Sequence, residues 1–231
     1  LSQLLLVQPK LVRFTLNLMV VQKKINDLFN SIKNKLKDSC KEITKNMNKR
    51  GGGIINMKLL NKTESIKDYF QIAVEFDTVD SMGANFINSC LEQIALTFET
   101  EFNESNIFNE SEKLKIIMSI LSNYTPKCVV KVELKSKISN LKSKDISDPE
   151  NFAKKFVEAV EIAENDISRA VTHNKGIMNG IDAVVIATGN DFRAVEAAIH
   201  AYASKDGSYM SLTHAKIEND EFIYWIEIPI S

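Results

Sequence analysis

The chain has 231 residues, of which 44% are hydrophobic and 26% charged, and its formal net charge is −1. This length allows one large domain or two modest ones, and the low proline and glycine content excludes a largely disordered chain. The near-zero net charge gives no indication of a partner, although the first 50 residues carry eleven Lys and Arg against three Asp and Glu. That excess is either a solvated helix face or a positive field for a phosphorylated ligand.

Cysteine usage and the start of the chain limit the cellular context. Cys40, Cys90 and Cys128 lack the spacing of a metal site, so no metal is expected, and we interpret them as reduced thiols of a cytoplasmic protein. The apolar first segment is interrupted by Lys10 and Arg13, which excludes a transmembrane helix or a signal peptide. No membrane partner is therefore expected.

The first half of the chain predicts four strands and two helices. In chain order we expect a strand within 2–16, an amphipathic helix over 18–43, a strand from Gly51–Gly53 to Leu60, a strand over 69–78, a helix capped by Asp80 or Ser81, and a strand over 113–121. This order is typical of a split βαβ unit, a ferredoxin-like antiparallel sheet with two helices on one face. The fold class is therefore α+β.

The second half has a different texture and predicts part of a larger mixed α/β domain. We expect a strand over 127–135, a helix over 150–165 with Pro149 in its first turn, a buried helix and a strand within 167–188, a helix over 191–204, and a hairpin of residues 208–217 and 221–229. The change falls near residues 122–126. It divides the chain into domains of residues 1–124 and 125–231.

The most informative stretch runs from Thr172 to Asp182 and then through Ala187-Thr188-Gly189-Asn190-Asp191. It places Lys175 and Asp191 16 positions apart in an apolar segment. An ammonium held among apolar side chains loses its charge unless it reaches water or pairs with an anion. The two residues therefore form either a structural ion pair or a catalytic pair that stabilises negative charge on a substrate oxygen.

A second motif, Asp80-Ser81-Met82-Gly83-Ala84-Asn85, lies where a predicted strand ends and a helix begins. Backbone N–H groups at such a helix start attract phosphate, with the helix dipole behind them. Gly83 would let a ligand approach the backbone closely. A plain helix cap is the alternative, and no G-x-G-x-x-G run is present.

Both motifs resemble those of a known family. The lysine stretch continues into Asp191-Phe192-Arg193-Ala194-Val195-Glu196-Ala197, and Arg50-Gly51-Gly52-Gly53 precedes the second motif. These runs are similar to the signature of 3-hydroxy-3-methylglutaryl-CoA reductase, in its class II (bacterial-type) branch, with Ser81 in place of an alanine. In that family the upstream motif contacts a nicotinamide dinucleotide. The resemblance therefore assigns cofactor binding to Asp80, Met82, Gly83, Ala84 and Asn85.

The resemblance implies a reaction and residue roles. The reaction is NAD(P)H-dependent reduction of 3-hydroxy-3-methylglutaryl-CoA to mevalonate and CoA by two hydride transfers. Lys175 would stabilise the oxyanion and Asp191 would hold Lys175. Arg169 and Asn179 match family positions that contact the acyl-CoA, although Arg169 could instead form a surface salt bridge with Asp166 or Glu164. Because relatives build the active site between two subunits, a homodimer or higher symmetric oligomer is expected.

The preferred dinucleotide is suggested by the helix before the glycine run. Relatives that prefer NADH carry an acidic residue some seven positions before that run, whereas this chain has Ile43-Thr44-Lys45. Nothing there repels a 2′-phosphate, and Lys45 could attract it. NADPH is therefore favoured, with NADH as the alternative.

The chain also departs from the family. The proton-donating glutamate and the flap histidine of relatives have no counterpart here, and Ile167-Ser168 replaces a usual Pro-Tyr. We therefore interpret the chain as a fragment, or else as a catalytically incomplete pseudoenzyme that keeps only dinucleotide or CoA binding. A helix-surface pair is expected for His200 and Glu196, and no chemistry for His214. Nucleic-acid binding is not expected, because residues 54–60 offer no aromatic ring for base stacking.

Overall fold

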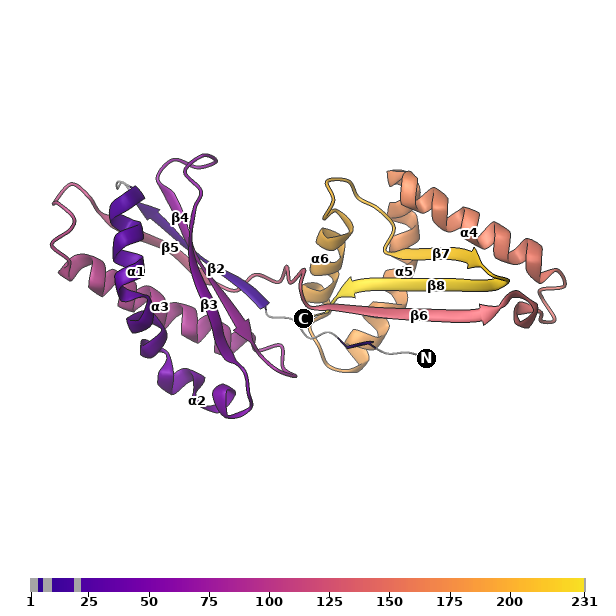
Figure 1. The fold of residues 1–231 in the computed structure, drawn as a ribbon, viewed down its shortest axis with the longest axis horizontal. Coiled ribbons are helices and arrows are strands. Elements are labelled where there is room, and N and C mark those ends of the chain that lie inside the picture. The colour runs from indigo at the N-terminus through magenta and orange to yellow at the C-terminus, as the bar shows by residue number, and fades with distance from the viewer. Residues whose placement is uncertain (1–3, 6–9, 19–21, 231) are drawn as a thin grey trace. The chain divides into compact units, whose positions relative to one another are not determined.

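The structure is a computed structural model that describes residues 4–5, 10–18 and 22–230. The chain divides into two compact units (Figure 1). The N-terminal unit is Pro9–Ser122, and the C-terminal unit combines Leu1–Gln8 with Asn123–Ser231. The short strand β1 (Leu4–Leu5) pairs with a strand of the C-terminal unit, whereas the sequence placed these residues in the first domain.

The N-terminal unit is built on an antiparallel sheet. Its strands, in the spatial order β3-β4-β2-β5, are β3 (Gly53–Asn61), β4 (Tyr69–Asp77), β2 (Lys10–Leu18) and β5 (Leu114–Ile120). The strands β3 and β4 form the predicted hairpin, and β2 pairs with both β4 and β5. This order confirms the split βαβ arrangement. Of the strand predicted within 2–16, residues 2–3 and 6–9 lie outside the described residues.

Helices α1 (Gln22–Ser39), α2 (Lys41–Lys49) and α3 (Ala84–Glu104) belong to the same unit. The single helix predicted over 18–43 is wrong at Leu18, which ends β2, and beyond Ser39, while residues 19–21 lie outside the described residues. A turn at Cys40, whose N–H donates to the Lys37 carbonyl, separates two helices. Apolar side chains at three- and four-residue steps along α1 and α3 meet the sheet in one core. The largest fully buried side chains of this core are Phe70, Phe76, Phe98, Ile25, Leu36, Met57, Ile72, Ile87 and Leu91.

The C-terminal unit has a second antiparallel sheet. Its strands, in the order β1-β6-β8-β7, are β1, β6 (Val129–Lys137), β8 (Glu221–Pro229) and β7 (Thr213–Glu218). The predicted hairpin is confirmed, with Asn219 and Asp220 both in the left-handed region at φ 52° and 62°. Two such central residues are the requirement of a two-residue type I′ turn, and Asn and Asp tolerate it.

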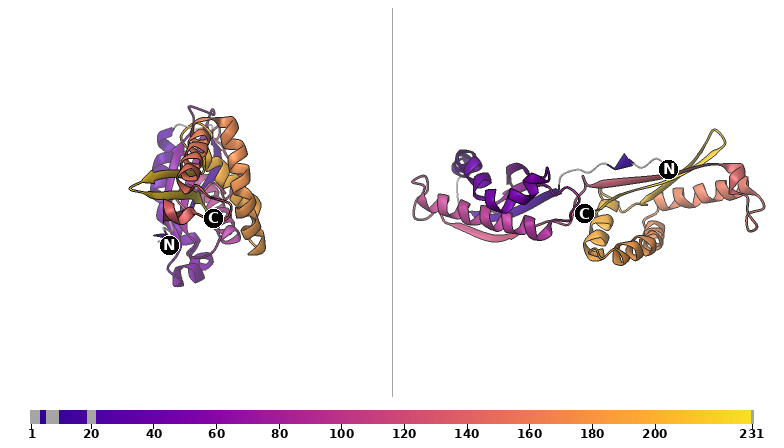
Figure 2. Two further views of the ribbon diagram at one scale, coloured as in Figure 1. Left: turned by 90° about the vertical axis from the view of Figure 1, so that its right-hand side faces the viewer. Right: turned by 90° about the horizontal axis from the view of Figure 1, so that it is seen from below.

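Three helices and a short 3-10 turn (Ile138–Leu141) complete this unit: α4 (Pro149–Asn165), α5 (Ile167–Ala187) and α6 (Phe192–Ala203). They lie on one side of the sheet, as the view from below in Figure 2 shows. Asp148 caps α4 by accepting from the Asn151 N–H at 3.0 Å, and Pro149 occupies the first turn, where a missing N–H costs nothing. The predicted first-turn role of Pro149 is thereby confirmed.

Within the segment 167–188, residues Ile167–Ala187 form a single 21-residue helix, so the strand predicted there is wrong. The prediction of burial also fails for much of it. Ala170, Asn174 and Met178 are buried at four-residue spacing, whereas Val171, Val184 and Ile186 are 52%, 63% and 57% exposed. Only part of the helix surface of α5 therefore packs on its own unit, although apolar residues are also present on its exposed sides.

Candidate functional site

The loop between β4 and α3 carries the second motif and is internally bonded. The Thr78 hydroxyl donates to the Ser81 carbonyl at 2.6 Å, and the Ser81 hydroxyl donates to the Thr78 carbonyl at 2.8 Å. The Val79 N–H donates to the Asp77 carboxylate at 2.8 Å. Val79 itself has a φ of 55°, which a β-branched residue rarely adopts. Such strain persists only where the surrounding bonds hold it, and it is frequent at ligand sites.

Two glycines allow close packing at this loop. Gly83 has a φ of 70°, and a Cβ there would lie 2.6 Å from the Thr78 methyl group. A Cβ on Gly52 would lie 2.5 Å from the Asp77 carbonyl oxygen, so the glycine run is seated directly against the end of β4. The N-cap of α3 is Gly83 and makes no side-chain cap bond, so the predicted caps Asp80 and Ser81 are wrong. Among the described residues, no side chain accepts from the first-turn N–H groups of α3, which suits a phosphate.

An ion pair joins the two glycine-containing segments. The Arg50 guanidinium donates to the Asp80 carboxylate, and both side chains are exposed. Met82, Gly83 and Ala84 are partly exposed and Asn85 is exposed. The residues predicted to contact the dinucleotide therefore share one accessible loop, with a guanidinium beside it.

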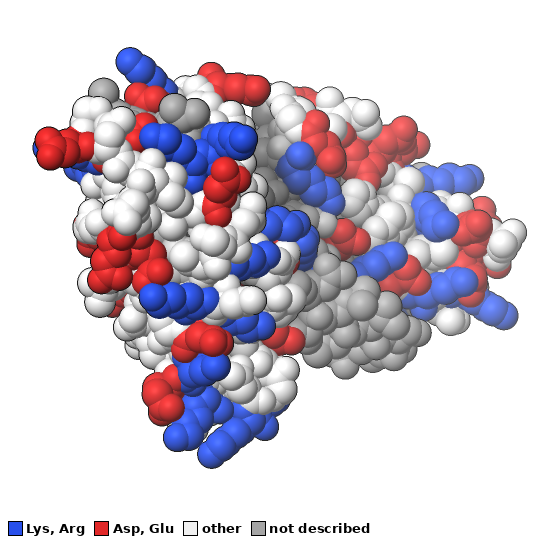
Figure 3. Space-filling model, turned by 60° about the vertical axis from the view of Figure 1, so that its left-hand side comes forward, with Lys and Arg blue, Asp and Glu red and all other residues white. Residues whose placement is uncertain are grey.

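Acidic side chains lie among the lysines of α1 and α2. Lys45, the expected phosphate partner, lies 3.6 Å from Glu42, and Lys41 pairs with Asp38 at 3.0 Å. Figure 3 shows blue and red side chains interleaved over the surface in view. The solvated-face interpretation therefore accounts for these helices, and Lys45 is an ordinary exposed partner of an acid.

The lysine motif lies on α5. Lys175 and Asn179 are exposed and four residues apart, so they share one face of the helix, and Arg169 is partly exposed one and a half turns earlier. Of the two alternatives left open for the Lys175 ammonium, reaching water or pairing with an anion, the structure shows the first. Within residues 22–230, its ammonium makes no ion pair or hydrogen bond, and Arg169 forms no salt bridge with Asp166 or Glu164.

Asp191 begins α6 and does not bond Lys175. Its carboxylate accepts from the N–H groups of Arg193 at 3.1 Å and Ala194 at 3.3 Å, and the Arg193 Nε lies 3.3 Å away. The Arg193 side chain, followed by the Ala194 N–H, holds the pKa of Asp191 below its usual range. The structure therefore gives Asp191 a helix-capping role and does not bring the predicted pair together as an ion pair.

The residues just before Lys175 attach α5 to the start of β7, which the sequence analysis missed. The His173 Nε2 lies 2.6 Å from the Thr213 hydroxyl, and the Asn174 side chain bonds the backbone on both sides of Ser211. Burial, and secondarily the Arg169 cation, lower the pKa of His173. The sequence did contain a signal for this attachment: Asn174 lies at four-residue spacing between Ala170 and Met178, which places a polar side chain on the buried face of the helix.

The other two histidines also have specific partners. The His214 Nδ1 lies 2.5 Å from the Glu164 carboxylate, and its ring stacks on Trp225 with a centroid distance of 5.1 Å. The His200 Nδ1 lies 2.8 Å from the Tyr209 hydroxyl, so the expected pairing with Glu196 is wrong. Both contacts cross between elements, which explains why neighbouring sequence did not predict them.

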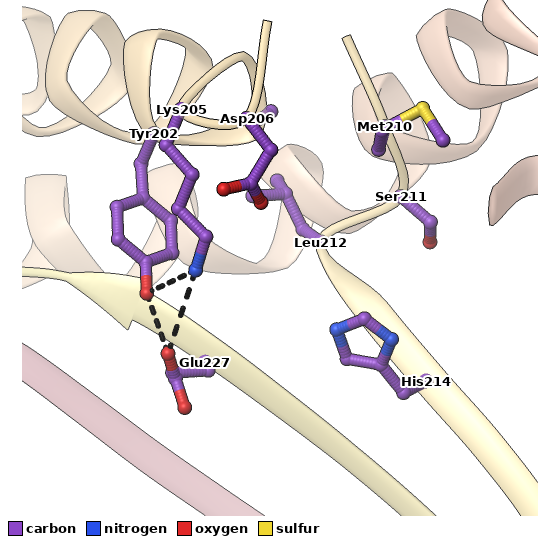
Figure 4. A pocket seen from close by; sticks show the side chains of 9 residues that line it. Tyr202, Lys205, Asp206, Met210, Ser211, Leu212, His214 and Glu227 are labelled. Carbon is purple, nitrogen blue, oxygen red and sulfur yellow. Dashed lines mark hydrogen bonds and ion pairs between the residues drawn. The ribbon is translucent and has the colours of Figure 1, made fainter. Parts of the chain in front are cut away.

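A pocket of about 200 Å³ opens between the end of α6 and the sheet (Figure 4). The Tyr202 hydroxyl donates to Glu227 at 2.5 Å, and the Lys205 ammonium donates to the same hydroxyl at 2.7 Å. Ser211 and His214 line the opposite side. No predicted site residue lines this pocket, and its volume is below the range of about 300–1,000 Å³ typical of ligand pockets.

Comparison with solved structures defines the class of protein to which this fold and these motifs belong. A 3-hydroxy-3-methylglutaryl-coenzyme A reductase from Streptococcus pneumoniae superposes with a TM-score of 0.82 at 31% identity, covering 98% of this chain and 52% of that one. A class II enzyme from the same organism, bound to NADPH in open conformations, gives a TM-score of 0.80 at 31% identity, covering 96% and 58%. The fold is that of rather more than half of a class II reductase of this type.

Sequence comparison gives the family. The model of the hydroxymethylglutaryl-coenzyme A reductase family matches residues 6–231. A "Probable 3-hydroxy-3-methylglutaryl-coenzyme A reductase" of Borreliella burgdorferi is 34% identical over 211 residues, which are 90% of this chain and 46% of that protein. A 3-hydroxy-3-methylglutaryl-coenzyme A reductase of Archaeoglobus fulgidus is 35% identical over 156 residues. The chain belongs to the hydroxymethylglutaryl-coenzyme A reductase family. Its match covers about half of the Borreliella burgdorferi and Streptococcus pneumoniae proteins, and 32% of the Archaeoglobus fulgidus protein.

Among the helices that the structure describes, none is long and apolar enough to cross a membrane.

Proposed function

We propose that this chain is the part of a 3-hydroxy-3-methylglutaryl-CoA reductase that carries its dinucleotide loop and its catalytic lysine. The reaction is the reduction of 3-hydroxy-3-methylglutaryl-CoA to mevalonate and CoA in the mevalonate pathway. The observation that carries the proposal is the family match over residues 6–231, with both motifs lying on accessible positions of the fold. The N-terminal unit, Pro9–Ser122, is assigned to dinucleotide binding, and the C-terminal unit to the acyl-CoA, in a cytoplasmic homodimer or higher symmetric oligomer. This corrects the sequence-based boundaries of residues 1–124 and 125–231, because β1 pairs within the C-terminal unit.

The cofactor assigned to the N-terminal unit is NADPH, with NADH as the alternative. Three features of the loop suit a nucleotide phosphate: the uncapped start of α3, the absence of a side chain at Gly83, and the exposed Arg50 guanidinium. The Streptococcus pneumoniae class II enzyme of similar fold is described as bound to NADPH. Asp80, Met82, Gly83, Ala84 and Asn85 would line the cofactor, which supplies hydride when bound.

The residues of α5 would meet the acyl-CoA. Reduction of a thioester places negative charge on the carbonyl oxygen, and a fixed ammonium stabilises that charge. Lys175 is suited to this role because its exposed ammonium is not neutralised by any described acid. Asn179, on the same face, would donate to the acyl group, and Arg169 offers a planar cation to a carboxylate or phosphate. Asp191 would influence Lys175 either indirectly, by holding the start of α6 next to the end of α5, or directly, if its carboxylate left Arg193 and turned to the lysine.

The alternative is a chain that binds dinucleotide or CoA without turnover. It is favoured by one observation: the pairing of Asp191 with Arg193 leaves Lys175 without the carboxylate expected to hold it. General acid catalysis typically contributes about 10²–10⁴-fold, so a site without its proton donors would turn over very slowly.

The test follows the absorbance of NADPH, then of NADH, when 3-hydroxy-3-methylglutaryl-CoA is added to this chain. If the chain is catalytic, Lys175→Ala should lower turnover by about 10²-fold or more, whereas Lys154→Ala, an exposed lysine on α4, should not. Absence of turnover, with NADPH binding by titration that is lost in Asp80→Ala and kept in Glu64→Ala, would establish the binding-only alternative. Absence of both turnover and binding would refute the proposal for this chain.

A further inference from the structure

The amide of Asn174 is the most enclosed polar group of the described part of α5. The residue is 0% exposed and lies between Ala170 and Met178, which are also buried. Its Nδ2 donates to the Met210 carbonyl at 2.9 Å, and its Oδ1 accepts from the Leu212 N–H at 3.0 Å. Both polar ends of the side chain are thus satisfied by one short backbone segment that leads into β7.

Apart from the His173–Thr213 contact, the remaining packing of α5 in this region is apolar and therefore weakly directional. Met178 joins a cluster with Val195, Ile199 and Leu212, and Ile181 packs against its edge. Such contacts tolerate rotation or sliding of a helix, because the hydrophobic effect depends on area and not on direction. The two amide hydrogen bonds do not tolerate it, because they require both donor–acceptor distance and angle. The preceding residue, His173, also contacts the start of β7, because its Nε2 lies 2.6 Å from the Thr213 hydroxyl.

Lys175 follows Asn174 directly and lies about 100° further around the helix. A rotation that broke the Asn174 bonds would therefore move the face that carries Lys175 and Asn179 by the same angle. Enclosed polar groups that are fully bonded are a known means of fixing one register among several similar apolar packings.

We propose that Asn174 is a positioning residue that fixes the rotation of α5, and thereby the direction in which Lys175 and Asn179 face. The part of this inference that concerns substrate rests on the proposed function. The part that concerns helix rotation does not.

The test compares Asn174→Leu, which keeps a similar volume and removes both hydrogen bonds, with Asn165→Leu. Asn165 is exposed at the end of α4, and its amide makes one bond, to the Glu161 carbonyl. Spin labels at Val184→Cys on α5 and Ile217→Cys on β7 report the helix position by pulsed electron paramagnetic resonance. The native cysteines are buried and should label poorly.

We expect one narrow distance in the parent and in Asn165→Leu, and a broadened or shifted distance in Asn174→Leu. A rotation of about 30° moves a helix side chain by about 3 Å, given a radius of about 5–6 Å. Lower thermal stability with an unchanged distance would assign Asn174 a structural role only and overturn the proposal. If Asn174→Leu does not fold, Asn174→Ser, which removes the amide geometry without adding bulk, is measured in the same way with the same two outcomes.

Calorimetric titration with 3-hydroxy-3-methylglutaryl-CoA addresses the substrate-facing part. Asn174→Leu should bind at least about ten-fold more weakly, because a misplacement of about 1 Å is costly at such sites, while Asn165→Leu should match the parent. Equal affinity of Asn174→Leu and the parent would overturn the positioning of the substrate face. If the parent itself does not bind, the proposed function fails for this chain, and the spin-label distance still decides whether Asn174 fixes the helix.

Discussion

At the scale of the residue, Gly83 and Gly189 share a backbone conformation but differ in their surroundings. Their φ values are 70° and 72°, yet an added Cβ meets the Thr78 methyl at 2.6 Å in the first case and open space in the second. A left-handed φ costs an L residue about 1–2 kcal/mol. Steric overlap in a packed site adds about 1–3 kcal/mol.

We therefore expect Gly83→Ala to lower the free energy of unfolding by more than Gly189→Ala does, by about 1–3 kcal/mol. Urea denaturation measures the free energy of unfolding of both variants. Because both glycines have a left-handed φ, the backbone contribution cancels in the difference between the two losses. Equal losses would mean that the Thr78 side chain yields freely, and that the loop is not held as the Thr78–Ser81 bonds indicate.

Cys40 and Cys90 give a second prediction for individual residues. Both thiols are 0% exposed, and the Cys40 thiol donates to the Cys90 carbonyl at 3.5 Å. A hydrogen bond from the Cys90 thiol lowers the pKa of Cys40, and the same bond, with burial, raises the pKa of Cys90. Because reaction needs an accessible thiolate, a thiol reagent should label neither residue in the native chain and both in denaturant. Rapid native labelling of Cys40 would show that the turn between α1 and α2 opens readily.

At the scale of the element, Asp191 determines how α6 begins. Its carboxylate accepts two first-turn N–H groups and meets the Arg193 side chain. Asp191→Asn keeps an oxygen acceptor for the cap and loses the charge, whereas Asp191→Ala loses both. The melting temperature at pH 7 should therefore fall in the order parent, Asp191→Asn, Asp191→Ala.

The charge of Asp191 also predicts a pH dependence. Its pKa is lower in the folded chain than its usual value, because Arg193 stabilises the ionised form. The stabilisation is therefore complete above the usual carboxyl pKa of about 4 and disappears as the pH falls through the lower folded value. The difference in melting temperature between the parent and Asp191→Asn should shrink as the pH falls below about 4. A difference that grows on acidification would contradict the sign of this pKa shift.

At the scale of the whole molecule, exposed apolar side chains on α5 predict a tendency to associate. Val184 and Ile186 are each more than half exposed, and exposed apolar surface favours self-association. Val184→Lys and Ile186→Lys should each reduce binding of a hydrophobic dye and light scattering at high protein concentration. Because neither side chain is buried, the free energy of unfolding should change by no more than about 0.5 kcal/mol.

Ile199→Lys is the matched control for these substitutions. Ile199 is 0% exposed in the core of the same unit, so a charge there should unfold the unit. If Val184→Lys were equally destabilising, α5 would be packed against something on that face in solution.

The sequence by itself determined most of the order of elements and the family, although it missed the break between α1 and α2 and placed a strand within α5. The period of Ile25, Leu28, Phe29 and Ile32 indicated α1, and the paired turn residues Asn219 and Asp220 indicated the last hairpin. These are local patterns, since each depends on helix or strand geometry and not on distant contacts. The motifs, which are also contiguous, were enough for the resemblance that the family match then confirmed.

Only the tertiary structure decided the partners of the charged and polar groups. The sequence could not show that Asp191 faces Arg193, that Asp80 faces Arg50, or that Lys175 is exposed. A carboxylate pairs with whichever cation the fold brings near, and an apolar sequence around α5 does not say which face is covered. Burial and ion pairing depend on contacts between segments far apart in the chain, which explains why the motifs identified the family while the geometry of its site had to come from the fold.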